Sequence, residues 1–296
     1  MNKKYTNKLE EVMLNRREVG VSFEFFPPKT DEMEQKLWQA ITKLEKLNPD
    51  FISVTYGAGG STRERTHQTV KRILSETDLK PASHLTCIGA SKDEIAQILD
   101  NYWQIGVRHI VALRGDMPAS NPDYQLHPDG FKYASDLVAA IKSQNPDFEI
   151  SVAGYPEKHP EAKDLESDID NLKRKVDAGA DRIITQFFFD PDDYFRFVDK
   201  CRSAKIEVPI IPGILPVSNV KQVKHFAKMC GASIPKWMEE IFVDLDNHQE
   251  TRQLIAAIVA TELCRILHEG GIDNFHFYTL NRADLVTAIC RVFLKC

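Results

Sequence analysis

Hydrophobic positions along the chain follow two spacings. Short runs rich in β-branched and aromatic residues recur about every thirty residues, and between them lie longer segments whose apolar residues are three or four positions apart. The first pattern is typical of buried β-strands and the second of amphipathic helices. Eight strands are predicted, at residues 21–26, 51–55, 82–87, 109–113, 150–154, 182–188, 209–213 and 275–277.

Residues with side-chain oxygens mark the starts of several predicted helices. Thr30 precedes one helical pattern, and Ser91 with Glu94 three positions later has the spacing of a capping box. Ser218 stands in a similar position before a further helix. The interval 213–275 is longer than the others and holds two helical patterns with an additional piece, so we interpret it as an insertion within the repeat.

The repeat of strand and helix predicts the fold class. Eight such units match a (β/α)8 TIM barrel with extra helices, whose active site lies at the carboxyl ends of its strands. An open, doubly wound sheet is the alternative. The barrel is favoured because nearly every predicted strand ends in a side chain that can bind or react: Glu24, Thr55, His84, Arg114 with Asp116, Tyr155, Gln186 and Tyr278.

Glu24 is the first candidate for catalysis. It lies within Val-Ser-Phe-Glu-Phe-Phe-Pro-Pro, residues 21–28, so phenylalanines flank a carboxylate on a predicted strand. Apolar surroundings penalise the ionised form, and a carboxyl group that keeps its proton towards neutral pH can act as a general acid. Alternation along the strand puts residues 22, 24 and 26 on one face, which in a barrel points inward. The alternative is a strand-end carboxylate that reaches water or pairs with Lys29.

Composition narrows the class of protein. The 296 residues, 43% hydrophobic and 27% charged, fit one large globular domain or two small ones. A net charge of −5 with scattered basic residues argues against nucleic-acid binding. The six cysteines form no Cys-x-x-Cys pair and no zinc spacing with histidine, so we expect reduced thiols, no metal site and a cytoplasmic protein. The longest aliphatic run, residues 254–260, is far shorter than the roughly 20 residues that span a bilayer, so no membrane partner is expected.

A glycine-rich loop at residues 57–62 follows one predicted strand and precedes a helix, as a dinucleotide-binding fingerprint does. Its third glycine position is occupied by Thr62, however, and no phosphate-binding loop of the Gly-x-x-x-x-Gly-Lys type occurs elsewhere. The loop therefore indicates close approach of backbone to a ligand rather than a Rossmann fold.

A second candidate binding surface lies on the helix predicted after residue 160. Asp168, Asn171 and Lys175 share one face of this helix, with Arg174 beside them. An acid, an amide and two cations in this arrangement can hold a ribose and a pyrophosphate. A solvated helix face is the alternative. Because polar strand ends also serve aldolases and lyases, the residues by themselves leave open a flavin-free barrel lyase and a folate- or nucleotide-binding protein without turnover.

Nine motifs in a fixed order supply a resemblance that covers residues 20–290. They are Val-Ser-Phe-Glu-Phe-Phe-Pro-Pro, Val-Thr-Tyr-Gly-Ala, His-Leu-Thr-Cys, Ala-Leu-Arg-Gly-Asp, Tyr-Pro-Glu-x-His-Pro-Glu-Ala, Asn-Leu-Lys-Arg-Lys-x-Asp-Ala-Gly-Ala, Ile-Thr-Gln-Phe-Phe-Phe-Asp, Pro-Gly-Ile-Leu-Pro-Val and Phe-His-Phe-Tyr-Thr-Leu-Asn-Arg. Together they resemble the methylenetetrahydrofolate reductase family of the bacterial type. The resemblance implies a barrel that holds FAD and takes reducing equivalents from NADH. It also implies conversion of methylene-tetrahydrofolate to methyl-tetrahydrofolate by a ping-pong mechanism. The product would supply methyl groups for methionine synthesis.

The resemblance also implies roles for individual residues. Glu24 would protonate the bridging nitrogen of the folate, and Asp116 would lie beside the flavin and the pterin and lower the flavin's reduction potential. Positions implied to contact FAD are Thr55, Tyr56, Ala58, His84, Arg114, Gly115, Asp116, Tyr133, Ala134, Tyr155, His159, Ala162, Asp168, Asn171, Arg174 and Lys175. Positions implied to bind substrate are Asp116, Gln186, Gln222, Phe226, Tyr278 and Arg282.

The expected organisation is a single TIM-barrel catalytic domain over residues 1–296, with residues 1–19 as an N-terminal extension. The expected partners are methylene-tetrahydrofolate and NADH, without nucleic acid or membrane. The resemblance further implies a homo-oligomer, specifically a tetramer, and a preference for NADH.

Overall fold

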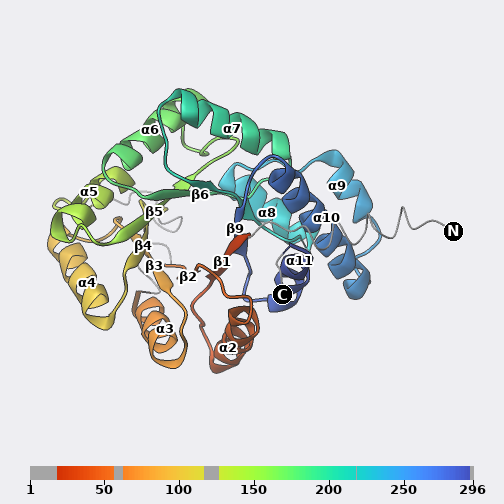
Figure 1. The fold of residues 1–296 in the computed structure, drawn as a ribbon, viewed down its shortest axis with the longest axis horizontal. Coiled ribbons are helices and arrows are strands. Elements are labelled where there is room, and N and C mark those ends of the chain that lie inside the picture. Colours follow the sequence, from red (N-terminus) through yellow and green to blue (C-terminus); the bar gives the residue numbers. More distant parts are fainter. Residues whose placement is uncertain (1–18, 57–62, 117–126, 218, 294–296) are drawn as a thin grey trace.

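Parallel strands form the centre of the molecule, and helices surround them (Figure 1). The computed structural model describes residues 19–56, 63–116, 127–217 and 219–293. Its strands are hydrogen-bonded in the order β7-β6-β5-β4-β3-β2-β1-β9-β8. They are β1 (Gly20–Phe25), β2 (Phe51–Val54), β3 (Pro81–Thr86), β4 (His109–Leu113), β5 (Glu149–Gly154), β6 (Arg182–Thr185), β7 (Ile210–Ile211), β8 (Gly213–Ile214) and β9 (Asn274–Tyr278).

The strand predicted at residues 209–213 is divided at Pro212. β7 pairs with β6, whereas β8 pairs with β9 on the other side. Pro212 has no N–H to donate, but its carbonyl accepts a hydrogen bond from the His276 N–H at 3.0 Å. Because β7 and β8 are consecutive in the chain, this change of partner closes the sheet into a barrel. The predicted TIM barrel is therefore confirmed, and the alternative of an open sheet is wrong. Among the described residues the sheet has nine strands instead of the predicted eight, because the strand predicted at 209–213 is two strands.

β6 ends at Thr185, three residues before the predicted boundary at residue 188. The N–H of Phe187 is hydrogen-bonded to the side-chain oxygen of Gln186 at 3.0 Å, so it is not available to a neighbouring strand. Phe187 and Phe189 instead join a hydrophobic cluster with Met238 and Phe242 of the 213–275 interval, whereas Phe188 packs into the main core.

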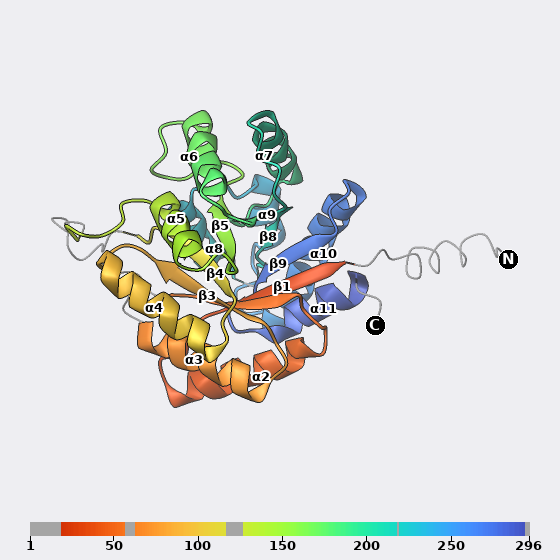
Figure 2. The ribbon, with the colours of Figure 1, turned by 60° about the vertical axis from the view of Figure 1, so that its left-hand side comes forward.

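Helices lie on the outside of the barrel in both views (Figures 1 and 2). In the described part of the chain they are α2 (Asp31–Glu45), α3 (Arg63–Glu76), α4 (Lys92–Ile105), α5 (Ala134–Gln144), α6 (Leu165–Asp177), α7 (Pro191–Ser203), α8 (Val220–Cys230), α9 (Lys236–Ile241), α10 (Gln249–Glu269) and α11 (Ala283–Phe293). The expected insertion consists of α8, α9 and α10. Within the described ranges, no helix has the length and apolar character needed to cross a membrane.

Two of the predicted helix starts have the expected caps. The Thr30 hydroxyl accepts from the backbone at the start of α2, and Ser91 and Glu94 form both bonds of a capping box at α4. The cap of α8 differs from the prediction: Asn219 accepts the hydrogen bond, one residue after Ser218, which lies outside the described residues. Both types of side chain can cap a helix, so spacing alone did not separate these neighbouring positions.

Alternation along β1 separates two environments. Val21, Phe23 and Phe25 are buried in the large hydrophobic core between the barrel and its helices. Ser22 and Glu24 point into the barrel, as the strand period predicts. β1 thus anchors the outer core with three apolar side chains while it presents a carboxyl group to the interior.

Candidate active site

A cavity of about 330 Å³ opens at the carboxyl ends of the strands. We call it the acid cavity, because Glu24 lines it together with His84, His276 and Tyr278. Two more cavities adjoin it. The middle cavity, about 230 Å³, includes Gly115, and the outer cavity, about 310 Å³, includes residues of α6. Tyr155 lines all three, so the cavities adjoin one another across the end of the barrel, and together we call them the groove.

Glu24 lies between two histidines. Its Oε2 atom is 3.3 Å from Nε2 of His84 and 4.0 Å from Nε2 of His276, and its side chain is only 12% exposed. Burial lowers the pKa of His84, although the charge of Glu24 opposes this effect. Among the described residues, these histidines rather than Lys29 are the basic side chains within 4 Å of the Glu24 carboxyl group. The carboxyl group is therefore held in a sheltered, polar setting at the barrel end.

The loop after β9 holds the backbone that follows the Glu24 side chain. The Thr279 hydroxyl donates to the carbonyl of Glu24 at 2.6 Å. The Asn281 side chain accepts from the N–H of Phe26 at 2.8 Å and donates to its carbonyl at 2.9 Å. Leu280 and Asn281 have φ angles of 49° and 57°, in the left-handed region, so this loop turns sharply. These bonds fix the direction in which the carboxyl group projects.

One wall of the acid cavity depends on a glycine. The Tyr278 hydroxyl donates to the carbonyl of Thr185 at 2.7 Å, and the Gly213 N–H donates to the Thr185 hydroxyl at 2.9 Å. A Cβ atom on Gly213 would lie 2.1 Å from the Thr185 carbonyl oxygen and 2.6 Å from the Tyr278 ring. Only glycine therefore lets the phenol ring and β6 meet at this point. Burial raises the pKa of Tyr278 well above its usual value, which keeps the hydroxyl protonated as a donor.

The middle cavity contains the Arg114-Gly115-Asp116 segment. Gly115 has a φ of 91°, and a Cβ atom there would lie 2.6 Å from the Ile88 side chain. Arg114 forms an ion pair with Glu161 at 2.7 Å, while Asp116 is exposed and lines the cavity. The backbone of this segment can thus approach a ligand closely, with one carboxylate left facing the cavity.

The polar face predicted for α6 lines the outer cavity. The half-buried Lys175 donates from Nζ to the carbonyl of Ala153 at 2.6 Å. Burial lowers the pKa of Lys175 to about 8, although Asp168 opposes the shift. Asp168 in turn accepts from the N–H of His159 at 2.8 Å. A fully solvated face is therefore wrong for Lys175 and Asp168, while Asn171 lies exposed at the rim.

Most of the predicted site residues meet in this groove. Those that line its three cavities are Glu24, Thr55, Tyr56, His84, Arg114, Gly115, Asp116, Tyr133, Ala134, Tyr155, His159, Ala162, Asp168, Asn171, Arg174, Lys175, Gln186, Phe226 and Tyr278. Ala58 and its glycine-rich loop lie outside the described residues. Gln222 and Arg282 are exposed and are not among the residues that line the three cavities.

Among the lining residues that the sequence did not single out are His276, Cys230 and Glu161. His276 lies two positions before Tyr278 on β9, so strand alternation was a usable signal for it. Cys230 lies four positions after Phe226 on α8, and helical spacing was a signal there. Glu161 is brought to Arg114 only by the packing of separate loops, for which no local pattern exists.

A closed (β/α)8 barrel with a sheltered acid and adjoining cavities at the carboxyl ends of its strands is the architecture of a barrel enzyme. The sequence model of the methylenetetrahydrofolate reductase family matches residues 8–293, and the chain belongs to this family. It is 55% identical over 273 residues to the 5,10-methylenetetrahydrofolate reductases of Salmonella typhimurium and Escherichia coli, covering 92% of this chain and 90% of each relative. The predicted family is thereby confirmed, and with it reduction of methylenetetrahydrofolate as the supported activity.

More distant relatives add to this. Methylenetetrahydrofolate reductase (NADH) 1 of Arabidopsis thaliana is 36% identical over 94% of this chain, which spans 48% of that protein. A solved structure from Clostridium thermocellum, described as binding two copies of 5-methyl-5,6,7,8-tetrahydrofolic acid, has a TM-score of 0.61 at 17% identity and covers 96% of this chain and 97% of that one. At that identity it shows the fold alone.

Proposed function

We propose that this protein reduces 5,10-methylenetetrahydrofolate to methyl-tetrahydrofolate with a bound FAD, which NADH reduces in turn. The main support for this proposal is the position of Glu24 next to two histidines at one end of the groove. Past Tyr155, the other end of the groove contains the cations of α6. One end can supply a proton, and the other can hold a nucleotide.

The side chains and backbone groups that line the groove suit a flavin dinucleotide. The middle cavity combines Tyr56 and Tyr155 with the backbone of Gly115, which suits a flat aromatic ring system. The outer cavity offers Arg174 and Lys175, which suit a pyrophosphate. When bound, the flavin accepts hydride from NADH and passes it to the folate.

Glu24 is proposed as the general acid of folate reduction. It would hold a proton and give it to the bridging nitrogen of the folate, so that the five-membered ring opens to an iminium that can accept hydride. The neutral imidazole of His84, 3.3 Å away, supports this role because it can orient the carboxyl group without fixing its negative charge. Asp116 is proposed to disfavour negative charge on the neighbouring cofactor, which favours departure of hydride towards the folate.

Substrates are proposed to share the acid cavity. Gln186, Phe226 and Tyr278 line it and offer an amide, an aromatic face and a phenol to a pterin or a nicotinamide in turn. With one cavity of about 330 Å³ beside the cofactor groove, the two substrates would alternate, which supports ping-pong kinetics. Gln222 and Arg282 are proposed to contact the exposed tail of the folate.

The remaining parts of the proposal concern organisation. The barrel supports one catalytic domain over residues 1–296, and the proposed extension at 1–19 lies outside the described residues except for Val19. A cytoplasmic location fits the free state of the described cysteines. A homo-oligomer, the NADH preference and a role in methionine supply are proposed on the resemblance to the family alone.

A single spectroscopic experiment tests the proposed function. The purified protein should be yellow, NADH should bleach it under anaerobic conditions, and methylene-tetrahydrofolate should restore the colour. Absence of a flavin would favour a flavin-free barrel lyase. A flavin that NADH bleaches but the folate does not reoxidise would favour a binding protein without folate turnover.

A further inference from the structure

The backbone pairing between β1 and β9 stops just past Glu24, at the rim of the acid cavity. Glu24 lies opposite Tyr278, and the Thr279 N–H donates to the Glu24 carbonyl at 3.3 Å. One more pair in the same register would join the Phe26 N–H to the Thr279 carbonyl, and the Asn281 N–H to the Phe26 carbonyl. In the structure, both of these β9 groups have other partners.

The loop after β9 uses these groups to turn away from β1. The Asn281 N–H donates to the Thr279 hydroxyl at 3.1 Å, and the Arg282 N–H donates to the Thr279 carbonyl at 2.9 Å. The turn requires φ angles of 49° at Leu280 and 57° at Asn281, a left-handed conformation that asparagine adopts more readily than most residues. The backbone of the loop therefore leaves the N–H and carbonyl of Phe26 without their ladder partners.

The side-chain amide of Asn281 takes the place of both partners. Its Oδ1 accepts from the Phe26 N–H at 2.8 Å, and its Nδ2 donates to the Phe26 carbonyl at 2.9 Å. A backbone N–H can only donate and a carbonyl can only accept, so the orientation of the amide is fixed. Pro27 and Pro28 follow and have no N–H, so the chain after Phe26 offers no further donor to β9 at these positions.

The two chain segments that Asn281 joins form one wall of the acid cavity. Glu24 and Phe26 line this cavity from β1, and Tyr278 and Leu280 line it from β9. Asn281 is not among the lining residues, so it affects the cavity only through the residues that it holds. This arrangement is that of a positioning residue.

We propose that Asn281 is a positioning residue for folate reduction: by holding Phe26, it fixes the direction in which Glu24 projects into the acid cavity. The inference rests on the proposed function, in which Glu24 protonates the folate. A general acid must come within about 3 Å of the atom that it protonates, and a displacement of about 1 Å can slow a reaction about a hundredfold. Reduction of the flavin by NADH takes no proton from Glu24. Loss of the amide therefore impairs one half-reaction and spares the other.

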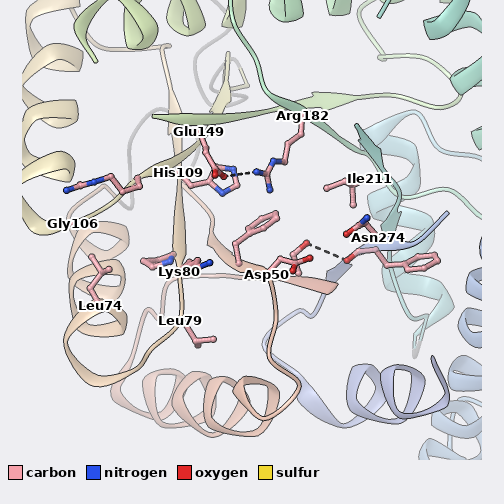
Figure 3. A pocket seen from close by; sticks show the side chains of 15 residues that line it. Asp50, Leu74, Leu79, Lys80, Gly106, His109, Glu149, Arg182, Ile211 and Asn274 are labelled. Atoms are coloured by element: carbon pink, nitrogen blue, oxygen red, sulfur yellow. Dashed lines mark hydrogen bonds and ion pairs between the residues drawn. The ribbon is translucent and has the colours of Figure 1, made fainter. Parts of the chain in front are cut away.

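Asn274 offers a matched control at the other end of β9. It lines a cavity of about 660 Å³ among the amino ends of the strands, where Figure 3 shows it with Asp50. Asn281→Gly and Asn274→Gly remove the same side chain, but only the first releases Phe26. Glycine also adopts the left-handed φ of Asn281 without strain, so the turn is kept when the amide is lost.

The experiment measures each half-reaction of the holoenzyme by stopped flow, with methylene-tetrahydrofolate at saturating concentration. Asn281→Gly should slow the limiting rate of folate reduction by about tenfold to a hundredfold. Reduction of the flavin by NADH should stay within about twofold of the wild type, and the Kd for the folate within about threefold. Asn274→Gly should change none of these quantities.

A double-mutant cycle tests whether Asn281 acts through the acid. In a Glu24→Gln protein the group to be positioned is gone, so adding Asn281→Gly should slow folate reduction by no more than about a further twofold. A residue with a merely structural role would instead give losses that multiply. This comparison separates positioning of Glu24 from a general weakening of the barrel end.

Several results would overturn the inference. They are a limiting rate of folate reduction in Asn281→Gly within about twofold of the wild type, equal slowing of both half-reactions, and losses that multiply in the double mutant. A weaker Kd for the folate with an unchanged limiting rate would make Asn281 a binding residue. If Asn281→Gly does not fold, Asn281→Ser replaces it, because a hydroxyl is too short to meet both groups of Phe26. Near-normal folate reduction in Glu24→Gln alone would contradict the proposed function itself, so the two failures are distinguishable.

Discussion

The pH dependence of FAD binding by the apoprotein follows from the position of Lys175. Burial lowers the pKa of this ammonium to about 8, whereas an unperturbed lysine titrates near 10.4. If the charged form holds the pyrophosphate, about nine-tenths of the protein is competent at pH 7 and about one-tenth at pH 9. The Kd for FAD should therefore rise about tenfold over this interval.

Other shifted groups in the groove titrate outside this window. Burial raises the pKa of Tyr56 to about 12 and that of Cys230 to about 11, and it lowers the pKa of His159 below its usual value. A change in affinity between pH 7 and 9 can thus be assigned to Lys175. Flavin fluorescence, titrated with apoprotein from pH 6.5 to 9.5, measures it directly.

Two substitutions complete the test. Lys175→Met should bind FAD more weakly and with no pH dependence across this range. Lys173→Met is the matched control, because Lys173 lies on the same helix but forms an ion pair with Asp177 at 2.7 Å, away from the groove. The Lys173→Met protein should keep both the affinity for FAD and its pH dependence. A wild-type Kd that stays constant from pH 7 to 9 would refute the reasoning, and so would loss of the pH dependence in Lys173→Met.

Three further predictions concern catalysis and packing. Glu24→Gln should slow folate reduction by about a hundredfold to ten-thousandfold, while NADH still reduces the flavin at a near-normal rate. Stopped-flow measurement of each half-reaction tests this prediction. Near-normal folate reduction would contradict the role of Glu24 as the acid. Asp116→Asn should raise the flavin midpoint potential and slow folate reduction, so an unchanged potential in a redox titration counts against the electrostatic argument. Gly213→Ala should destabilise the protein by about 1–3 kcal/mol, because the new Cβ meets the Thr185 carbonyl at 2.1 Å, and a thermal melt equal to the wild type would contradict this.

Much of the fold could be read from local patterns. Alternation in β1 separates Phe23 from Glu24 because a strand's side chains point to opposite faces whatever lies beyond them. Capping at Thr30 and Ser91 is equally local, since the bonded atoms are three residues apart. The residues that line the groove were found because strand ends in a barrel share one rim, together with the resemblance of their motifs.

Closure of the sheet and the placement and burial of the site side chains were decided only by the tertiary structure. The strand at residues 209–213 divides because its two halves meet different neighbours, and no pattern within five residues shows that. The placement of His84 and His276 beside Glu24 depends on the register between strands distant in sequence. The burial that lowers the pKa of Lys175 depends on how α6 packs against β5.

The sequence by itself therefore predicted the barrel and the family and singled out Glu24 as the candidate acid, since periodicity and motifs are properties of neighbouring residues. Only the tertiary structure brought Ser22 and His276 within hydrogen-bonding distance inside the barrel. The physical reason is that a hydrogen bond between residues 254 positions apart exists only after the sheet has closed and aligned β1 with β9.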